Sequence, residues 1–117
     1  MMRKLFAIDP EVGSGGREVV VVGTGRMALL AHTCLLQEGV AAAAFCDPSG
    51  LHVGDAIMGR PVVSAEELRE GHADAQVVWA GDDPARAEGE LASLGVADAW
   101  VDLRAYDVVN DAVWTFM

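Results

Sequence analysis

Apolar runs separated by glycine-rich or polar turns divide the chain into alternating predicted strands and helices. Residues 19–22 are four consecutive valines, and a run of β-branched residues without polar alternation is typical of a central strand covered on both faces. Helical spacing of apolar residues predicts a helix over residues 27–38, which Gly39 then ends. Residues 40–46 follow as a second strand, although their alanines are poor strand formers.

Strand and helix alternate again in the second half of the chain. The remaining strands are predicted at residues 61–63, 76–80 and 99–102. Ser64 and Glu67 form a capping-box pattern that opens one helix, and Asp83 followed by Pro84 is typical of the start of another. Alternating β and α units imply a parallel sheet with helices on both faces. The sequence therefore predicts an α/β fold, a Rossmann-like three-layer sandwich with a mainly parallel five-stranded sheet.

The length of 117 residues fits one domain and suffices to bury a hydrophobic core. We expect residues 1–17 to form an N-terminal arm and a glycine-rich linker, and residues 18–117 to form the single domain. The N-terminal apolar run is too short for a signal peptide. Because Cys34 and Cys46 form no Cys-x-x-Cys pair, we expect free thiols in the cytoplasm.

Composition restricts the class of partner. The chain carries 8 Lys and Arg against 18 Asp and Glu, a formal charge of −10, which disfavours nucleic acid and anionic membranes as partners. No apolar stretch is long enough to span a membrane. A phosphate-containing ligand remains compatible with this charge, because backbone N–H groups and one local arginine can bind it.

The turn between the first strand and the first helix carries the strongest functional pattern. Its residues, Gly23-Thr24-Gly25-Arg26-Met27-Ala28, match the Gly-x-Gly-x-x-Gly/Ala fingerprint of nucleotide-binding turns. The first glycine permits a tight turn, the second lets the backbone approach a phosphate, and the small sixth residue lets the helix pack closely. Arg26 is either a phosphate contact or a solvated residue of the first helical turn.

Acidic residues follow two of the predicted strands. Asp47 comes about 20 residues after the turn, where a Rossmann acid bonds a ribose hydroxyl, and its charge favours NAD over NADP. The alternative is that Gly23 and Gly25 serve only the turn and that Asp47 only caps the next loop. Asp82 and Asp83 follow the fourth strand; they suit acid–base chemistry, but a helix cap at Asp83 is the simpler interpretation.

With these residues, the chain resembles the N-terminal Rossmann-like domain of the sugar O- and N-acyltransferases of sialic acid and bacillosamine biosynthesis. The resemblance is carried by residues 21–26, by residues 45–48 with 57–62, and by residues 78–86. It implies UDP-sugar binding, with the uridine near Asp47 and with Gly23, Gly25 and Gly81 as ligand neighbours. Pro48 and Asp82, which adjoin Asp47 and Gly81, complete the predicted site. This sequence lacks the family's hexapeptide repeats and the histidine of its turn, so the resemblance does not carry acetyl transfer.

Little in the sequence predicts catalysis. His32, His52 and His72 are scattered without metal-ligand spacing, and there is no Gly-x-Ser-x-Gly elbow. We interpret His32 as a helix-surface or partly packed residue. We therefore expect neither a metal site nor a catalytic residue, and the chain is predicted to be a binding domain rather than an enzyme.

Three hypotheses for function remain. The first is a nucleotide or UDP-sugar binding module linked to sugar modification, with a catalytic domain acting as its partner. The second is an NAD(H)-binding protein, as a redox sensor or an oxidoreductase subunit. The third is an oligomerisation or partner-docking module without a ligand, for which the apolar residues 114–117 suggest a homodimer contact. The ligand itself stays unassigned between a UDP-sugar and an NAD-type nucleotide.

Overall fold

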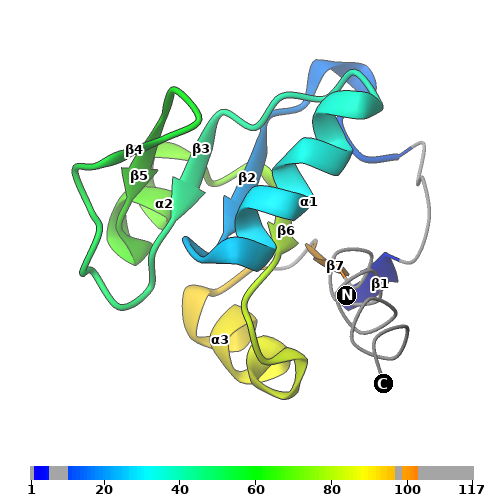
Figure 1. Cartoon of the computed structure of the whole chain (residues 1–117). Helices are drawn as coiled ribbons and strands as arrows, with labels where there is room; N and C mark the ends of the chain where they lie inside the picture. The colour runs from blue at the N-terminus through cyan, green and yellow to red at the C-terminus, as the bar shows by residue number, and fades with distance from the viewer. Residues whose placement is uncertain (1, 6–10, 97–98, 103–117) are drawn as a thin grey trace, which may run out of the picture.

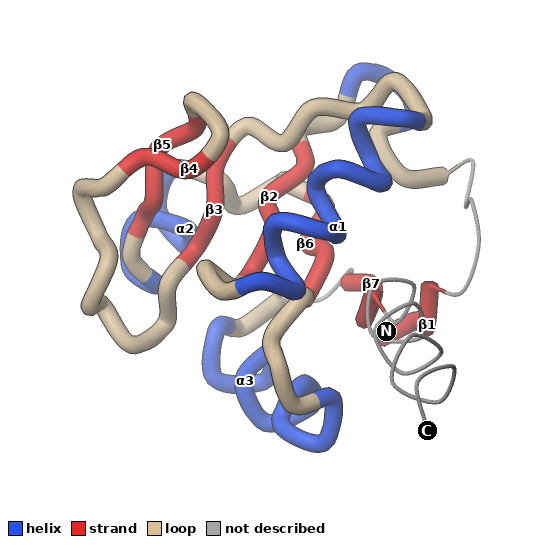
Figure 2. The backbone as a smooth tube through the Cα atoms, viewed as in Figure 1, coloured by secondary structure: helices blue, strands red, loops and turns tan. Residues whose placement is uncertain are grey.

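Three layers of secondary structure make up the computed structural model, which describes residues 2–5, 11–96 and 99–102 (Figure 1). The strands are β1 (Met2–Leu5), β2 (Val19–Val22), β3 (Ala44–Cys46), β4 (Ala56–Ile57), β5 (Arg60–Val63), β6 (Gln76–Trp79) and β7 (Ala99–Asp102). The α-helices are α1 (Arg26–Gln37), α2 (Ala65–Gly71) and α3 (Ala87–Leu94), with short 3-10 helices η1 (Ser14–Gly16) and η2 (Pro84–Arg86). Figure 2 separates these helices from the strands by colour.

The sheet confirms the Rossmann-like α/β prediction. Its strands lie in the order β1-β7-β6-β2-β3-β5-β4. All neighbouring strands pair in parallel except β4, which is antiparallel to β5. The five predicted strands form the centre, β5-β3-β2-β6-β7, which corresponds to strands 3-2-1-4-5 of the 3-2-1-4-5-6 Rossmann order. Two strands that the sequence pattern did not predict, β1 and β4, extend the two edges.

The four valines of β2 show why that run lacks polar alternation. Successive side chains of a strand point to opposite faces of the sheet. Val19 and Val21 belong to the apolar cluster beneath α1, together with Phe45. Val20 and Val22 belong to the opposite cluster, where α2 and α3 cover the sheet. All four valines are buried because each face carries a helical layer.

Residues 40–43 correct one predicted boundary. The second strand begins at Ala44 rather than at residue 40. The backbone N–H of Val40 donates to Leu35 O in the last turn of α1, and that of Ala42 donates to Nε2 of His32. These backbone groups therefore bond to the helix instead of forming a ladder, in keeping with the weak strand preference of alanine.

The predicted helix caps are present in the second half. Ser64 Oγ accepts from the N–H of Glu67 at 3.0 Å and so caps α2. Asp83 Oδ1 accepts from the N–H of Ala85 at the start of η2, which precedes α3. Gly95 ends α3 with a φ of 71°, a left-handed conformation that glycine adopts without strain.

Residues 11–17 lie against the body of the domain. Val12 is buried in the cluster beneath α1. The side chain of Gln76 accepts from the N–H of Gly13 at 2.7 Å and donates to the carbonyl of Glu11 at 2.9 Å. The domain boundary at residue 17 stays a prediction. The predictions for residues 103–117, including the dimer contact at 114–117, fall outside the described residues.

Candidate functional site

The glycine turn lies at the point where the order of the sheet reverses. The chain leaves β2 at Gly23 and enters α1 on one face, whereas the neighbouring strand β6 leads through Gly81 to α3 on the other face. Gly23 N–H donates to Cys46 O at 2.9 Å, and Ala80 N–H donates to Val22 O at 2.8 Å, so the three strand ends are tied together. Open α/β sheets bind ligands in this crevice, outside the carboxyl ends of the strands.

Gly23 is required by the packing of the turn itself. Its φ is 132°, and a Cβ atom there would lie 2.7 Å from the carbonyl oxygen of Ala80. Ala28, the small residue of the fingerprint, is fully buried where α1 packs on the sheet. The first and last positions of the fingerprint therefore act as the sequence predicts, in turning the chain and in bringing α1 close to β2.

The structure brings two predicted site residues together, Gly25 and Asp82. The side-chain oxygens of Asp82 lie 3.2 and 3.3 Å from the position that a Cβ atom would take at Gly25. Gly25 is the N-cap of α1, so this carboxylate stands beside the positive end of the helix dipole. The place where a phosphate would approach α1 thus already has a negative side chain next to it.

The other residues of the turn differ in exposure. Thr24 and Met27 are half-buried, whereas Arg26 is exposed at the first position of α1. With no acidic residue in its first turn and glycine as its N-cap, α1 begins without a side-chain cap. Its first backbone N–H groups form the anion-attracting end of the helix.

Asp47 is buried, and its carboxylate accepts hydrogen bonds from the loop that follows it. Its Oδ1 accepts from Ser49 N–H at 3.0 Å and from Ser49 Oγ at 2.6 Å, and its Oδ2 accepts from His52 N–H at 2.8 Å. Burial raises the pKa of Asp47, but these hydrogen bonds outweigh burial and leave the pKa below its usual value. Pro48, also predicted near the ligand, is exposed. The capping role that the sequence left open is therefore present.

Gly81 has a packing role beside the crevice. A Cβ atom at Gly81 would lie 2.5 Å from the ring of Trp79. That ring is buried, and its Nε1–H donates to Glu90 Oε2 at 3.0 Å, which ties the end of β6 to α3. Glycine at this position therefore makes room for the indole.

Cys46 and His32 have environments that the sequence did not fully show. Cys46, beside Asp47, is buried, and burial raises the pKa of its thiol to about 12, as expected of a small core residue. His32, expected to be a helix-surface or partly packed residue, is only 1% exposed, so it is more deeply buried than expected. Its position faces the sheet because Ala28, Ala31 and Leu35 share its side of α1.

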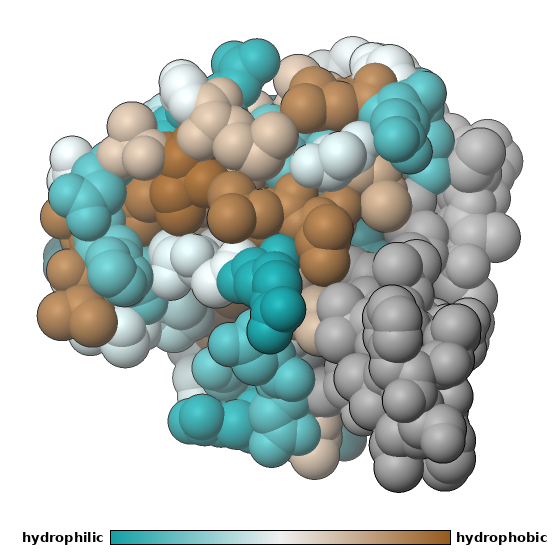
Figure 3. Space-filling model, in the orientation of Figure 1, coloured by the Kyte–Doolittle hydropathy of each residue, from teal (hydrophilic) through white to brown (hydrophobic). Residues whose placement is uncertain are grey.

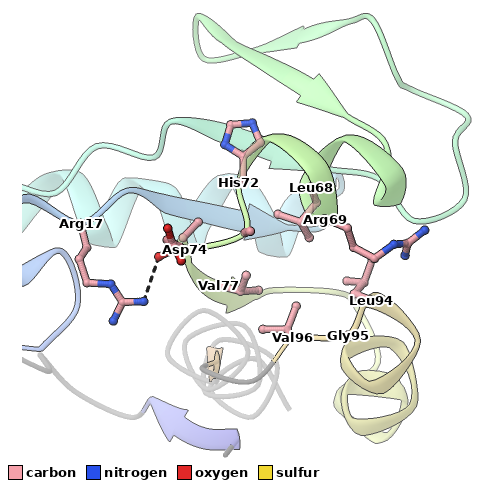
Figure 4. Close-up of a pocket in the computed structure, with 11 residues that line it drawn as sticks. Arg17, Leu68, Arg69, His72, Asp74, Val77, Leu94, Gly95 and Val96 are labelled. Atoms are coloured by element: carbon pink, nitrogen blue, oxygen red, sulfur yellow. Dashed lines mark hydrogen bonds between the residues drawn. The ribbon is translucent and has the colours of Figure 1, made fainter.

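A cavity of about 440 Å³ lies at the opposite edge of the sheet from the glycine turn. Its walls come from the ends of α2 and α3 and the start of β6, with Leu68, Val77 and Leu94 as apolar lining (Figure 4). Arg17 lies at one side, where its guanidinium donates to Asp74 O at 3.0 Å. The described cavity thus contains no residue of the predicted site.

The described residues hold no evident metal centre or membrane span. In residues 2–5, 11–96 and 99–102, no group of three or more His, Cys, Asp and Glu side chains is placed to hold a metal ion. No helix in the described part of the chain has the length and apolar character needed to cross a membrane.

Apolar residues gather on the outer surface of the α1 side. Figure 3 shows them as a band across the face that α1 covers. The large apolar residues exposed in the described part are Leu29, Leu36, Leu51 and Met58.

No protein-family model matches the chain, and no curated protein matches it. What is shown is therefore the Rossmann-like α/β topology alone, with a mostly parallel sheet.

Proposed function

We propose that this domain binds a nucleotide-type ligand, with a UDP-sugar as the first candidate, through phosphate contacts at residues 23–27. The observation that carries the proposal is the position of the glycine turn at the switch point between β2 and β6. The uncapped start of α1 supports it, since its N–H groups can receive an anion. The resemblance to sugar acyltransferase N-terminal domains supports the UDP-sugar class and a role in sugar modification.

Asp82 sets a condition on this binding. Its carboxylate stands beside Gly25, so a phosphate that approaches the turn meets a negative charge. Because Asp82 is exposed, its side chain can turn toward solvent without disturbing the core. The ligand therefore binds with Asp82 displaced, and the charge of Asp82 lowers the affinity for phosphate.

Asp47 supplies a positioned acceptor for the ribose in this proposal. Each carboxylate oxygen accepts about two hydrogen bonds. Oδ1 already has two donors from Ser49, while Oδ2 has the single donor from His52. A ribose hydroxyl would use the remaining lone pair of Oδ2, and the loop bonds would hold the carboxylate in place for it.

A ligand panel tests the proposal. Thermal unfolding is followed with UDP, UDP-N-acetyl sugars, NAD, NADH, NADP and CoA, for the wild type and for Gly25→Val, which fills the space beside the turn. A ligand at 100 times its Kd raises stability by about 2.7 kcal/mol, which is readily measured. Stabilisation by UDP compounds that Gly25→Val removes would support the proposal. Stabilisation by NAD alone would replace it with the NAD(H) hypothesis.

A partner-docking role without a ligand is the second candidate function. Two observations favour it: the carboxylate of Asp82 already lies beside the turn, and apolar side chains are exposed on the α1 face. If no ligand of the panel stabilises either the wild type or Asp82→Asn against thermal unfolding, the partner-docking role becomes the leading candidate. In either case, we propose a cytoplasmic protein that works with a separate catalytic domain.

A further inference from the structure

His32, a buried histidine of α1, contacts the sulfur atom of Met58, an exposed methionine. Nδ1 of His32 lies 3.4 Å from Sδ of Met58. The His32 ring is 1% exposed and packs edge-to-face on Phe45, with ring centroids 5.2 Å apart. Met58 is 45% exposed. One contact therefore connects the core beneath α1 with a sulfur-bearing side chain that solvent reaches.

The partner of the second ring nitrogen fixes the tautomer of His32. Nε2 lies 3.1 Å from the backbone N–H of Ala42, which can only donate. Nε2 is therefore the acceptor, and in the neutral ring the proton is on Nδ1, facing Met58 Sδ. Burial lowers the pKa of His32, and the charge of Arg60 lowers it further, so the ring is neutral at neutral pH.

Met58 occupies an unusual backbone position. It forms, with Gly59, the two-residue turn between β4 and β5, and the two φ angles are 51° and 76°. Turns of this type favour asparagine, aspartate or glycine at the first position. Among the described residues, Met58 is the one non-glycine residue with a positive φ. The turn thus presents the thioether to His32, at the edge of the sheet where β4 pairs with β5.

We propose that Met58 is a site of reversible oxidation by peroxides and that its sulfoxide breaks the present contact with His32. In this step a lone pair of Sδ attacks one oxygen of hydrogen peroxide, the O–O bond breaks and an S–O bond forms. The proton of the transferred oxygen passes to the departing hydroxide, which leaves as water. Sulfur loses two electrons, and hydrogen peroxide is reduced to water. A reductase with a thiol donor reverses the step.

The geometry explains why oxidation would be felt at His32. A hydrogen bond from Nδ1–H to the new oxygen needs about 2.9 Å, and the S–O bond adds to this length. The 3.4 Å between Nδ1 and Sδ does not accommodate both in line, so Met58 must move outward. If the oxygen instead points to solvent, Nδ1–H is left with an electron-poor sulfur as its neighbour. Both outcomes change the environment of Nδ1–H of His32.

The test uses the full chain treated with graded hydrogen peroxide. Fragment-ion mass spectrometry quantifies sulfoxide at Met58 and at half-buried Met27, and NMR follows the imidazole signals of the three histidines. We expect the His32 signal to shift in proportion to Met58 sulfoxide and to return after methionine sulfoxide reductase. His72, which ends α2 and lies outside the segment between β3 and β5 that contains Met58, is the internal reference that should stay unchanged.

Two comparisons make the result decisive. In Met58→Leu, which keeps an apolar side chain of similar volume, peroxide should leave the His32 signal in place. If that variant fails to fold, the graded treatment of the wild type carries the test, because the His32 shift should follow the extent of sulfoxide at Met58 and not at Met27. The proposal would be overturned by complete oxidation of Met58 with an unmoved His32 signal. It would equally be overturned if Met27 reacted fully while Met58 did not.

Discussion

The carboxylate of Asp82 lies against Gly25, with Oδ2 3.2 Å from where a Cβ atom would be. The two residues are 57 positions apart, yet both follow adjacent parallel strands and so reach the same edge of the sheet. The helix dipole of α1 favours an anion there, and Asp82 provides one. A ligand phosphate would therefore compete with this carboxylate for the positive potential at the start of α1.

Asp82→Asn should therefore strengthen the binding of phosphate ligands at the turn. Removing one unit charge at contact distance in a water-like medium changes affinity by about fivefold. Titration calorimetry with UDP measures it. Asp74→Asn is the matched control, because it removes the same charge at the opposite edge, where Arg17 bonds the backbone oxygen of Asp74. Equal affinities for both variants would show that Asp82 has no local effect.

Gly23→Ala should destabilise the fold. The left-handed φ of 132° and the 2.7 Å approach to Ala80 O cost about 3 kcal/mol together. Gly25→Ala should cost less than about 1 kcal/mol, because its φ of −90° suits any residue and the exposed Asp82 side chain can yield. Urea denaturation of both variants compares them. A Gly23→Ala protein as stable as Gly25→Ala would contradict the packing described at the turn.

Asp47→Ala should destabilise the loop after β3 by about 2–4 kcal/mol, since three donors lose a buried charged acceptor. The pKa of Asp47 is lowered on folding, so its contribution to stability is present above the ordinary pKa of 3.8. That contribution is lost as pH falls through the folded pKa. Stability curves of wild type and variant should converge in acid, and a constant difference down to pH 2 would argue against this role.

His32 predicts a second pH dependence. Its pKa is lowered by burial and by Arg60, so below the ordinary value of 6.5 the unfolded chain binds the proton first. Neutral His32 makes its whole contribution to the free energy of unfolding above pH 6.5, and this contribution is lost as the pH falls through the pKa of His32 in the folded protein. In His32→Phe, which keeps an aromatic ring on Phe45 but removes the acceptor for Ala42, the pH slope between pH 7 and 5 should be smaller. An unchanged slope would show that the buried ring of His32 does not contribute to this pH dependence.

The strand and helix pattern could be predicted well where local signals agree. The valine run of β2, the Ser64 cap and the glycine at 95 each act within a few residues, and each is found as expected. Residues 40–43 were mispredicted because the backbone N–H groups of Val40 and Ala42 bond to α1, which no local pattern shows. Strand β1 was not predicted, since its pairing with β7 joins residues far apart in sequence.

The sequence predicted where the glycine turn and Asp47 lie in the fold, but not what surrounds them, and their role as a ligand site stays a prediction. The glycine fingerprint and Asp47 follow β2 and β3 as expected. Burial of His32 and the approach of Asp82 to Gly25 depend on how loops from different strands pack at one edge. Spacing along the chain carries no information about that packing. The same holds for the contact between His32 and Met58, which joins two elements of the α1 side.

The most direct test of the nucleotide-binding account is an amide NMR titration of the wild type and Asp82→Asn with UDP. The account predicts saturable shifts centred on residues 23–27 and 81–82, with tighter binding by the variant. Absence of saturable shifts in both proteins, or shifts centred on the cavity lined by Leu68, Val77 and Leu94, would contradict it.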